Sequence, residues 1–320
     1  MAEKITRRKF LKGAAATALA LAIPHFAKAG RKGKVFFELG PHDTPEQARD
    51  KIQKRLDGEH KHFVLEHDPY SGHAMTSATA KEYLDAMKTS QDTTFQLSAM
   101  MTFGKEFPES SHPYVAERNR LIIRANQEEG KPRYFVHLEP ASLEAAKHYY
   151  DARQTISKMQ ESIKKGDGKK ALLHFQRYAL LFAMHNVERE KVITKTILDI
   201  HKEHPECDII VDLGPQHDAV ANEMRRKGLQ VSSRIVQPPQ TPAIVLTHAL
   251  IQSQRDKTER PKQEAFERAF LQELLVPEMG SEKASEIINE MNHSKLANVM
   301  AHLKKRGKNL TERAAQLVTQ

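Results

Sequence analysis

Polar, titratable side chains follow three separate apolar stretches of the chain. The first stretch leads into a Gly-Pro turn that ends at His42, the second ends at Glu66, and the third leads into a Gly-Pro turn that ends at His217. Imidazole and carboxylate groups act as general acids and bases, and they are common ligands of divalent metals. We therefore expect His42, Glu66 and His217 to form one site, as catalytic residues or as ligands of a metal such as Mn, Co or Zn.

The two turns that carry the histidines are near copies of each other. Residues 38–43 read ELGPHD and residues 212–218 read DLGPQHD, with one residue inserted. A single histidine after a strand usually caps a helix or bonds to the backbone, and that structural role is the alternative for His42. Two equivalent turns, together with an acidic residue at a third strand end, favour a shared functional site.

Short apolar stretches predict the strands that would position these residues. They cover 34–39, 62–66, 133–138, 208–213 and 229–236. The order strand, helix, strand over residues 34–66 predicts a βαβ unit, and hence a parallel pair with a right-handed crossover. Ligands of parallel α/β sheets bind at the carboxyl ends of the strands, which is where the three candidate residues fall.

Helix signals fill most of the remaining chain. Thr44 is a good N-cap, Pro45 suits the first helical position, and Gln47 completes a capping box. Residues 142–204 are rich in helix formers and are interrupted at 166–168, which predicts an antiparallel pair of long helices. After residue 238 the pattern is helical to the end of the chain.

The predicted fold class is therefore α/β, with a mainly parallel sheet, a helical insertion and a helical C-terminal appendage. We expect an export signal over 1–29, an α/β domain over 30–237 with its insertion at about 141–204, and a helical region over 238–320.

The first thirty residues have the order of an export signal. The charged segment around Arg7 and Arg8 is followed by an apolar run, 13–24, and then by the small-x-small sequence of residues 27–29. The paired arginines with Phe10 and Leu11 resemble the twin-arginine (Tat) motif, an address read by the Tat translocase. This resemblance implies a protein that crosses the membrane folded and works in the periplasm or elsewhere outside the cytoplasm.

Charge and composition exclude several classes of function. The whole chain has a net charge of +9, of which the segment before Gly30 carries +5, so the remainder carries about +4. That balance gives no argument for a nucleic-acid partner. No further apolar run reaches the ~20 residues that a membrane span needs. Cys207 is the single cysteine, so an internal disulfide is impossible, and we interpret it as a small buried hydrophobe.

Several well-known catalytic motifs are absent. The turn at residues 40–42 lacks the glycine spacing of a dinucleotide-binding fingerprint, and the chain has no Walker-type loop and no Gly-x-Ser-x-Gly elbow. It contains no Trp, which argues against a carbohydrate-stacking surface.

The pattern of turns resembles the superfamily of the erythromycin esterases, which also includes the TraB/Tiki proteins and the ChaN-like haem-binding proteins. The resemblance covers roughly residues 35–236 and lies in the two Gly/His turns, the Glu at the end of the second strand, and the stretches 117–119 and 188–190. The first turn departs from the pattern, because it is Gly-x-His where the Tiki proteins have Gly-x-x-His.

This resemblance implies roles for individual residues. His42 and Glu66 would be a general base pair or metal ligands, and His217 would be the second histidine of the site. Arg118 and Arg189 would contact substrate or form salt bridges inside the domain, of which the structural role is the simpler interpretation.

Three hypotheses follow. The first is an exported hydrolase that cleaves an ester or peptide bond in a small-molecule or peptide substrate, with water activated by Glu66 or His42, directly or through a divalent metal. The second is a non-catalytic periplasmic protein that binds haem or a metal. The third is an interaction or structural protein in which these side chains are merely polar loop residues.

Overall fold

The computed structural model describes residues 32–40, 42, 44–56, 61–66, 113–128, 134–138, 142–236, 240–305 and 307–319. The export signal expected over residues 1–29 lies outside these ranges.

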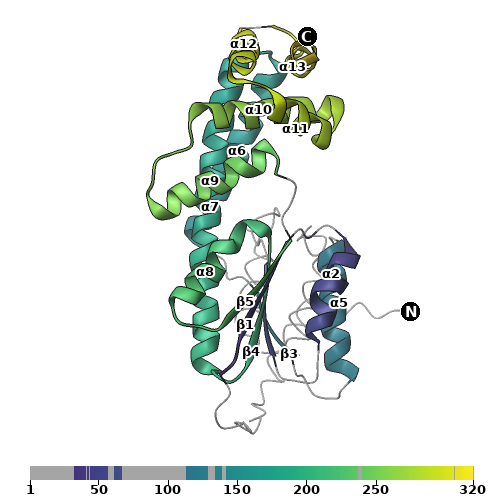
Figure 1. The fold of residues 1–320 in the computed structure, drawn as a ribbon, viewed down its shortest axis with the longest axis vertical. Coiled ribbons are helices and arrows are strands. Elements are labelled where there is room, and N and C mark those ends of the chain that lie inside the picture. Colours follow the sequence, from purple (N-terminus) through teal and green to yellow (C-terminus); the bar gives the residue numbers. More distant parts are fainter. Residues whose placement is uncertain are drawn as a thin grey trace, which may run out of the picture. The chain divides into compact units, whose positions relative to one another are not determined.

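A parallel five-stranded sheet is the centre of the α/β part of the described chain (Figure 1). Its strands are β1 (Val35–Leu39), β2 (Lys61–Leu65), β3 (Tyr134–Leu138), β4 (Asp208–Leu213) and β5 (Val231–Ile235). Their spatial order is β3-β2-β4-β1-β5, and every neighbouring pair is parallel. The predicted α/β fold class with a mainly parallel sheet and added helices is confirmed.

One prediction about this sheet is wrong in its detail. β1 and β2 are parallel, but they are not paired with each other, because β4 lies between them. All six residues of β4 are buried, as a strand flanked by neighbours and covered on both faces requires. The central position of β4 places its carboxyl end beside those of both β1 and β2.

Helices cover both faces of the sheet (Figure 1). α2 (Pro45–Ile52), followed by a 3₁₀ turn at Gln53–Arg55, and α5 (Pro113–Glu128) pack on one face around Phe63, Leu65 and Ile210. The C-terminal part of α7 (Gly168–Glu203) and α8 (Asp218–Arg226) pack on the other face.

Local signals set the ends of several elements. Thr44 and Gln47 form the predicted capping box at the start of α2, each side chain accepting a hydrogen bond from the backbone of the other. β5 begins two residues later than predicted, because Gly228 adopts a left-handed φ of 84° and the Leu229 N–H donates to the Met224 carbonyl. That bond closes the end of α8, so Leu229 belongs to a helix cap rather than to the strand.

The chain divides into two compact units. One comprises residues 1–141 and 191–237, and the other comprises residues 142–190 and 238–320. The second unit contains α6 (Leu143–Lys164), the first part of α7, α9 (Pro242–Asp256), α10 (Gln263–Met279), α11 (Ser281–Glu290), α12 (His293–Leu303) and α13 (Leu310–Thr319). The division at residue 237 stays a prediction, and the structure groups 142–190 with the C-terminal helices.

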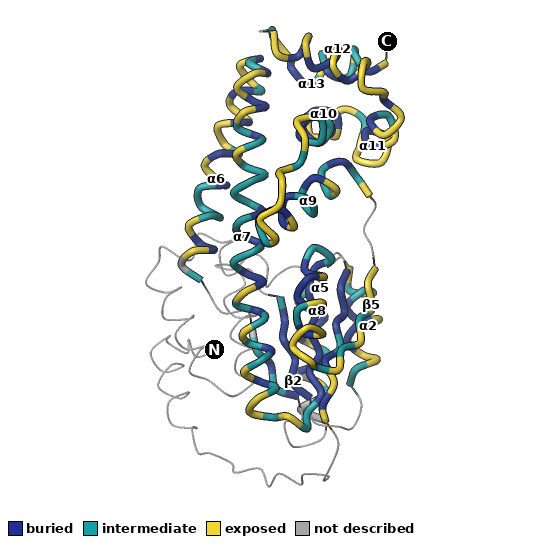
Figure 2. The backbone as a smooth tube through the Cα atoms, turned by 60° about the vertical axis from the view of Figure 1, so that its left-hand side comes forward, coloured by how far each residue is buried: buried dark blue, intermediate teal, exposed yellow. Residues whose placement is uncertain are grey.

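The helical unit has its own apolar core (Figure 2). Phe270 and Leu274 of α10 are fully buried, and Phe270 contacts Phe175 of α7 at a ring-centroid distance of 5.6 Å. The predicted break between α6 and α7 is confirmed, with Gly166 at a positive φ of 68°. Among the residues that the structure describes, no helix is both long and apolar enough to cross a membrane.

Candidate functional site

The structure brings the three predicted residues together at the carboxyl end of the sheet. His42 follows β1, Glu66 follows β2 directly, and His217 ends the 3₁₀ turn after β4. Glu66 lies between the two imidazoles, with its Oε2 3.7 Å from His42 Nδ1 and its Oε1 3.6 Å from His217 Nε2. This arrangement follows from the register, in which Glu38 of β1 and Leu65 of β2 both lie beside Asp212 of β4.

The end of β4 holds Glu66 in place. The Glu66 backbone N–H donates to the Asp212 carbonyl at 2.9 Å, and the Gly214 backbone N–H donates to Glu66 Oε2. Main chain and side chain of Glu66 are therefore both tied to the neighbouring strand, so the carboxylate has a defined orientation between the histidines.

Asp212 is a further member of the site, which the sequence analysis included only as the first residue of the turn motif at 212–218. Its carboxylate is fully buried, and His42 Nε2 lies 3.2 Å from its Oδ1. The Tyr114 hydroxyl donates to it at 2.8 and 2.9 Å, and Arg118 Nη1 donates at 3.2 Å. Lys51 Nζ lies 3.7 Å from Oδ1 and donates to the Gly40 carbonyl at 3.1 Å.

The charges around Asp212 determine its protonation state. Burial by itself raises the pKa of this carboxyl, but His42, Arg118 and Lys51 outweigh burial and hold the pKa well below its ordinary value. Burial, and then the negative charge of Asp212, raise the pKa of Tyr114 well above that of an exposed phenol. Asp212 is therefore an anion at neutral pH, and Tyr114 is a neutral donor to it.

Lys51 is a buried cation in the same network. Burial lowers the pKa of its amine, and the carboxylates of Asp212, Glu66 and Glu38 oppose that effect. Its location on the buried side of α2, three residues after Ala48, places a charge where helical periodicity would put an apolar residue.

His42 has both ring nitrogens directed at carboxylates. Its Nε2 faces Asp212 and its Nδ1 faces Glu66, while its ring stacks on Tyr114 at 4.4 Å with an interplanar angle of 18°. The side chains of His42 and Glu66 are 19% and 14% exposed, whereas those of Asp212 and His217 are fully buried. Within the described part of the chain, His42 and Glu66 are therefore the members of this group that solvent can reach.

A second carboxylate lies beside Asp212 but has a different partner. Glu38 accepts hydrogen bonds from Arg55 Nε at 2.9 Å and Nη2 at 2.5 Å, and the Arg55 guanidinium stacks over the Phe36 ring. These two bonds, both to Glu38 Oε1, hold the 3₁₀ turn after α2 against the sheet, and Glu38 has a structural role.

The two arginines singled out by the resemblance have different surroundings. Arg118 is fully buried and forms the ion pair with Asp212, so it has the salt-bridging role. Arg189 is buried on α7, in the helical unit.

The predicted metal ligands do not form an arrangement that fits a metal as they stand. The described residues hold no group of three or more His, Cys, Asp or Glu side chains that could bind a metal ion. His42 Nε2 is already directed at Asp212, and Glu66 Oε2 already accepts from Gly214. Metal and haem binding stay predictions.

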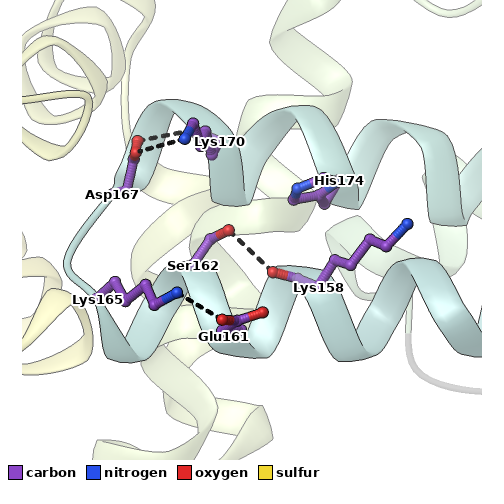
Figure 3. A pocket seen from close by; sticks show the side chains of 7 residues that line it. All are labelled: Lys158, Glu161, Ser162, Lys165, Asp167, Lys170 and His174. Carbon is purple, nitrogen blue, oxygen red and sulfur yellow. Dashed lines mark hydrogen bonds and ion pairs between the residues drawn. The ribbon is translucent and has the colours of Figure 1, made fainter.

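A polar hollow lies elsewhere, at the turn between α6 and α7 (Figure 3). It is lined by Lys158, Glu161, Ser162, Lys165, Asp167, Lys170 and His174. Lys165 pairs with Glu161, and Lys170 pairs with Asp167 (Figure 3), so most of its charges are balanced within the hollow.

Comparisons with known proteins identify the export signal. The family model of the TAT (twin-arginine translocation) pathway signal sequence matches residues 4–24. The protein is therefore exported across the cytoplasmic membrane to the periplasm or another extracytoplasmic space, and the Tat translocase is its partner during export. No curated protein and no solved structure matches the chain.

Proposed function

We propose that the protein is an exported hydrolase that cleaves an ester or peptide bond, with His42 as its general base and with Glu66 and His217 beside it. The observation that supports this best is the pair formed by His42 and the buried Asp212, whose atoms lie 3.2 Å apart. A buried carboxylate at one imidazole nitrogen orients the ring and stabilises the imidazolium that forms on proton transfer.

The role of His42 depends on which of its ring nitrogens is hydrogen-bonded to Asp212. Asp212 accepts the Nε2–H of His42, so in the neutral imidazole Nδ1 carries the lone pair and acts as general base. A water proton passes to Nδ1, and the hydroxide adds to the carbonyl carbon. The proton then passes to the alcohol or amine as its bond to that carbon breaks. Glu66, 3.7 Å from Nδ1, stabilises the charged imidazole, and His217 lies at its other oxygen.

The turns that carry these residues support a related proposal. Their resemblance to the erythromycin esterase, TraB/Tiki and ChaN-like superfamily agrees with a His/Glu site at the strand ends. We include membership of that superfamily in the proposal. The steps above use side chains alone, because the described residues do not form a metal-binding group.

Loss of His42 tests the proposal. We expect His42→Gln to lower kcat/KM by about 100-fold or more, as removal of a general base does. The measurement is a screen of the purified exported protein against p-nitrophenyl esters and fluorogenic peptides. His293→Gln is the matched control, because His293 is an exposed histidine of the helical unit.

Two results would count against the hydrolase. One is equal activity of the two variants and wild type, and the other is absence of turnover by wild type across both panels. In the second case, metal analysis and a haem titration followed by absorbance would test the alternative, a periplasmic protein that binds haem or a metal.

A further inference from the structure

Tyr114 contacts two members of the site at once. Its ring lies against the His42 imidazole, with centroids 4.4 Å apart, and its hydroxyl donates to the Asp212 carboxylate that orients the same imidazole. It is the second residue of α5, and no signal in the turns after the strands points to it.

The surroundings of Tyr114 are those of a polar site. On the same helix, Val115 and Ile122 belong to the apolar cluster beneath α2 and α5. Tyr114 is fully buried, and the imidazole, the carboxylate and two cations all lie against it. The Lys51 ammonium and the Arg118 guanidinium lie 5.1 and 5.9 Å from its ring centroid. A phenylalanine or leucine would fill this space without making the hydroxyl contact, so packing alone does not explain a tyrosine here.

We propose that Tyr114 is a positioning residue that sets the orientation and tautomer of His42. The catalytic consequence rests on the proposed hydrolase, whereas the effect on the imidazole itself does not.

Two separate contacts carry this role. The ring limits rotation of His42 about its side-chain bonds, because a flat imidazole against a flat phenol has few alternative rotamers. The hydroxyl lies 2.8 and 2.9 Å from the two Asp212 oxygens and limits rotation of that carboxylate, so Oδ1 stays directed at His42 Nε2. Together they keep the proton on Nε2 and leave Nδ1 facing Glu66.

Paired substitutions separate the two contacts. Tyr114→Phe removes the hydroxyl and keeps the ring, whereas Tyr114→Met removes both and keeps an adaptable apolar side chain. We expect kcat to fall about 3- to 10-fold in the first variant and about 10- to 100-fold in the second, with KM within twofold of wild type. Tyr178→Phe, a half-buried tyrosine of the helical unit, is the control and should leave both constants unchanged.

Nitrogen NMR of the His42 side chain gives a readout that does not depend on turnover. For the neutral form of the ring we expect the shifts of a single Nε2–H tautomer in wild type and a mixture of tautomers in Tyr114→Met. In Tyr114→Phe the Nε2 proton of His42 should exchange with water at least tenfold faster, because the Asp212 carboxylate has lost the hydroxyl that limits its rotation.

The outcomes separate failure of this inference from failure of the hydrolase. If both folded variants keep wild-type His42 shifts and proton exchange, Tyr114 does not position the ring. If wild type is inactive but the shifts change as expected, the positioning role stands and the hydrolase does not. Should Tyr114→Met fail to fold, Tyr114→Phe decides alone, since it differs from wild type by one oxygen.

Discussion

Asp212 is the residue on which the site depends most. It is an anion in a fully buried position, and it is tolerated there because an ammonium, a guanidinium, a phenol and an imidazole all lie within hydrogen-bonding or ion-pairing distance. Removing one partner from such a network leaves the others buried and uncompensated, which costs more than the network contributes relative to an apolar core.

The first stability prediction concerns this carboxylate. Asp212→Asn leaves Lys51 and Arg118 buried without their counter-charge, so we expect the free energy of unfolding to fall by about 3 kcal/mol. Urea denaturation followed by circular dichroism measures it. Asp50→Asn is the control, because Asp50 pairs with Lys54 and Arg234 at a largely exposed position and should change stability by less than about 1 kcal/mol. Equal losses in the two variants would contradict the prediction.

The sequence predicted which side chains lie close together where each of them follows a strand of the sheet. His42, Glu66 and His217 follow strands, and parallel strands bring their carboxyl ends to one edge, so their proximity was predictable. Tyr114 and Lys51 come from helices, and no local pattern specifies which helical side chain will lie over a given strand. Lys51 did leave a signal, a charge on the apolar side of α2.

At the scale of elements, β4 shows what a local pattern cannot predict. The strands and their parallel direction followed from composition and from the helix between β1 and β2. β4 lies between them because it pairs with β1, about 170 residues earlier in the chain. The order strand, helix, strand does not specify such a distant pairing. The near-copy turns after β1 and β4 are adjacent because of that insertion.

A cluster of histidines joins β2, β3 and the end of α7 on the face of the sheet that α7 covers. His62 of β2 and His137 of β3 lie 2.9 Å apart, from Nδ1 to Nε2, and His62 stacks on His204, at the end of α7, at 4.5 Å. Burial, and then the nearby His204, lower the pKa of His137 from 6.5 to about 4. The folded protein therefore keeps His137 neutral under conditions in which the unfolded chain protonates it.

This difference predicts a loss of stability in acid. Because the folded pKa lies below the unfolded one, the native state binds fewer protons, and stability falls as pH drops from about 6.5 towards 4. At pH 5 the loss relative to pH 7.5 is about 2 kcal/mol for this group. Urea midpoints between pH 7.5 and 4.5 measure it, and His137→Phe should flatten the dependence. A variant that keeps the full slope would show that other groups cause it.

At the scale of the whole molecule, the sequence indicated an α/β part, a helical insertion and a helical C-terminal region. It did not indicate that the insertion and the C-terminal helices form one unit. Phe266, Phe270 and Leu274 recur at four-residue spacing in the sequence, and Phe270 and Leu274 are fully buried on that apolar side of α10. An apolar stripe does not indicate which other helix packs against it, however. Phe270 packs on Phe175, so α6 and the first part of α7 share a unit with α9 to α13, which follow β4 and β5 in the chain.

The export signal makes folding a condition for reaching the site of action. The Tat translocase reads the twin-arginine address, so replacing Arg7 and Arg8 with lysines should retain the protein in the cytoplasm. Fractionation and immunoblotting of cells that produce the whole chain measure this.

His42→Gln with an intact signal is the control and should be exported like wild type, because His42 is partly exposed. Asp212→Asn should be exported less, since it exposes more unfolded chain to a pathway that carries folded cargo. Export of the twin-lysine variant at the wild-type level would mean that another route carries the protein, and the folding requirement argued from the signal would no longer apply.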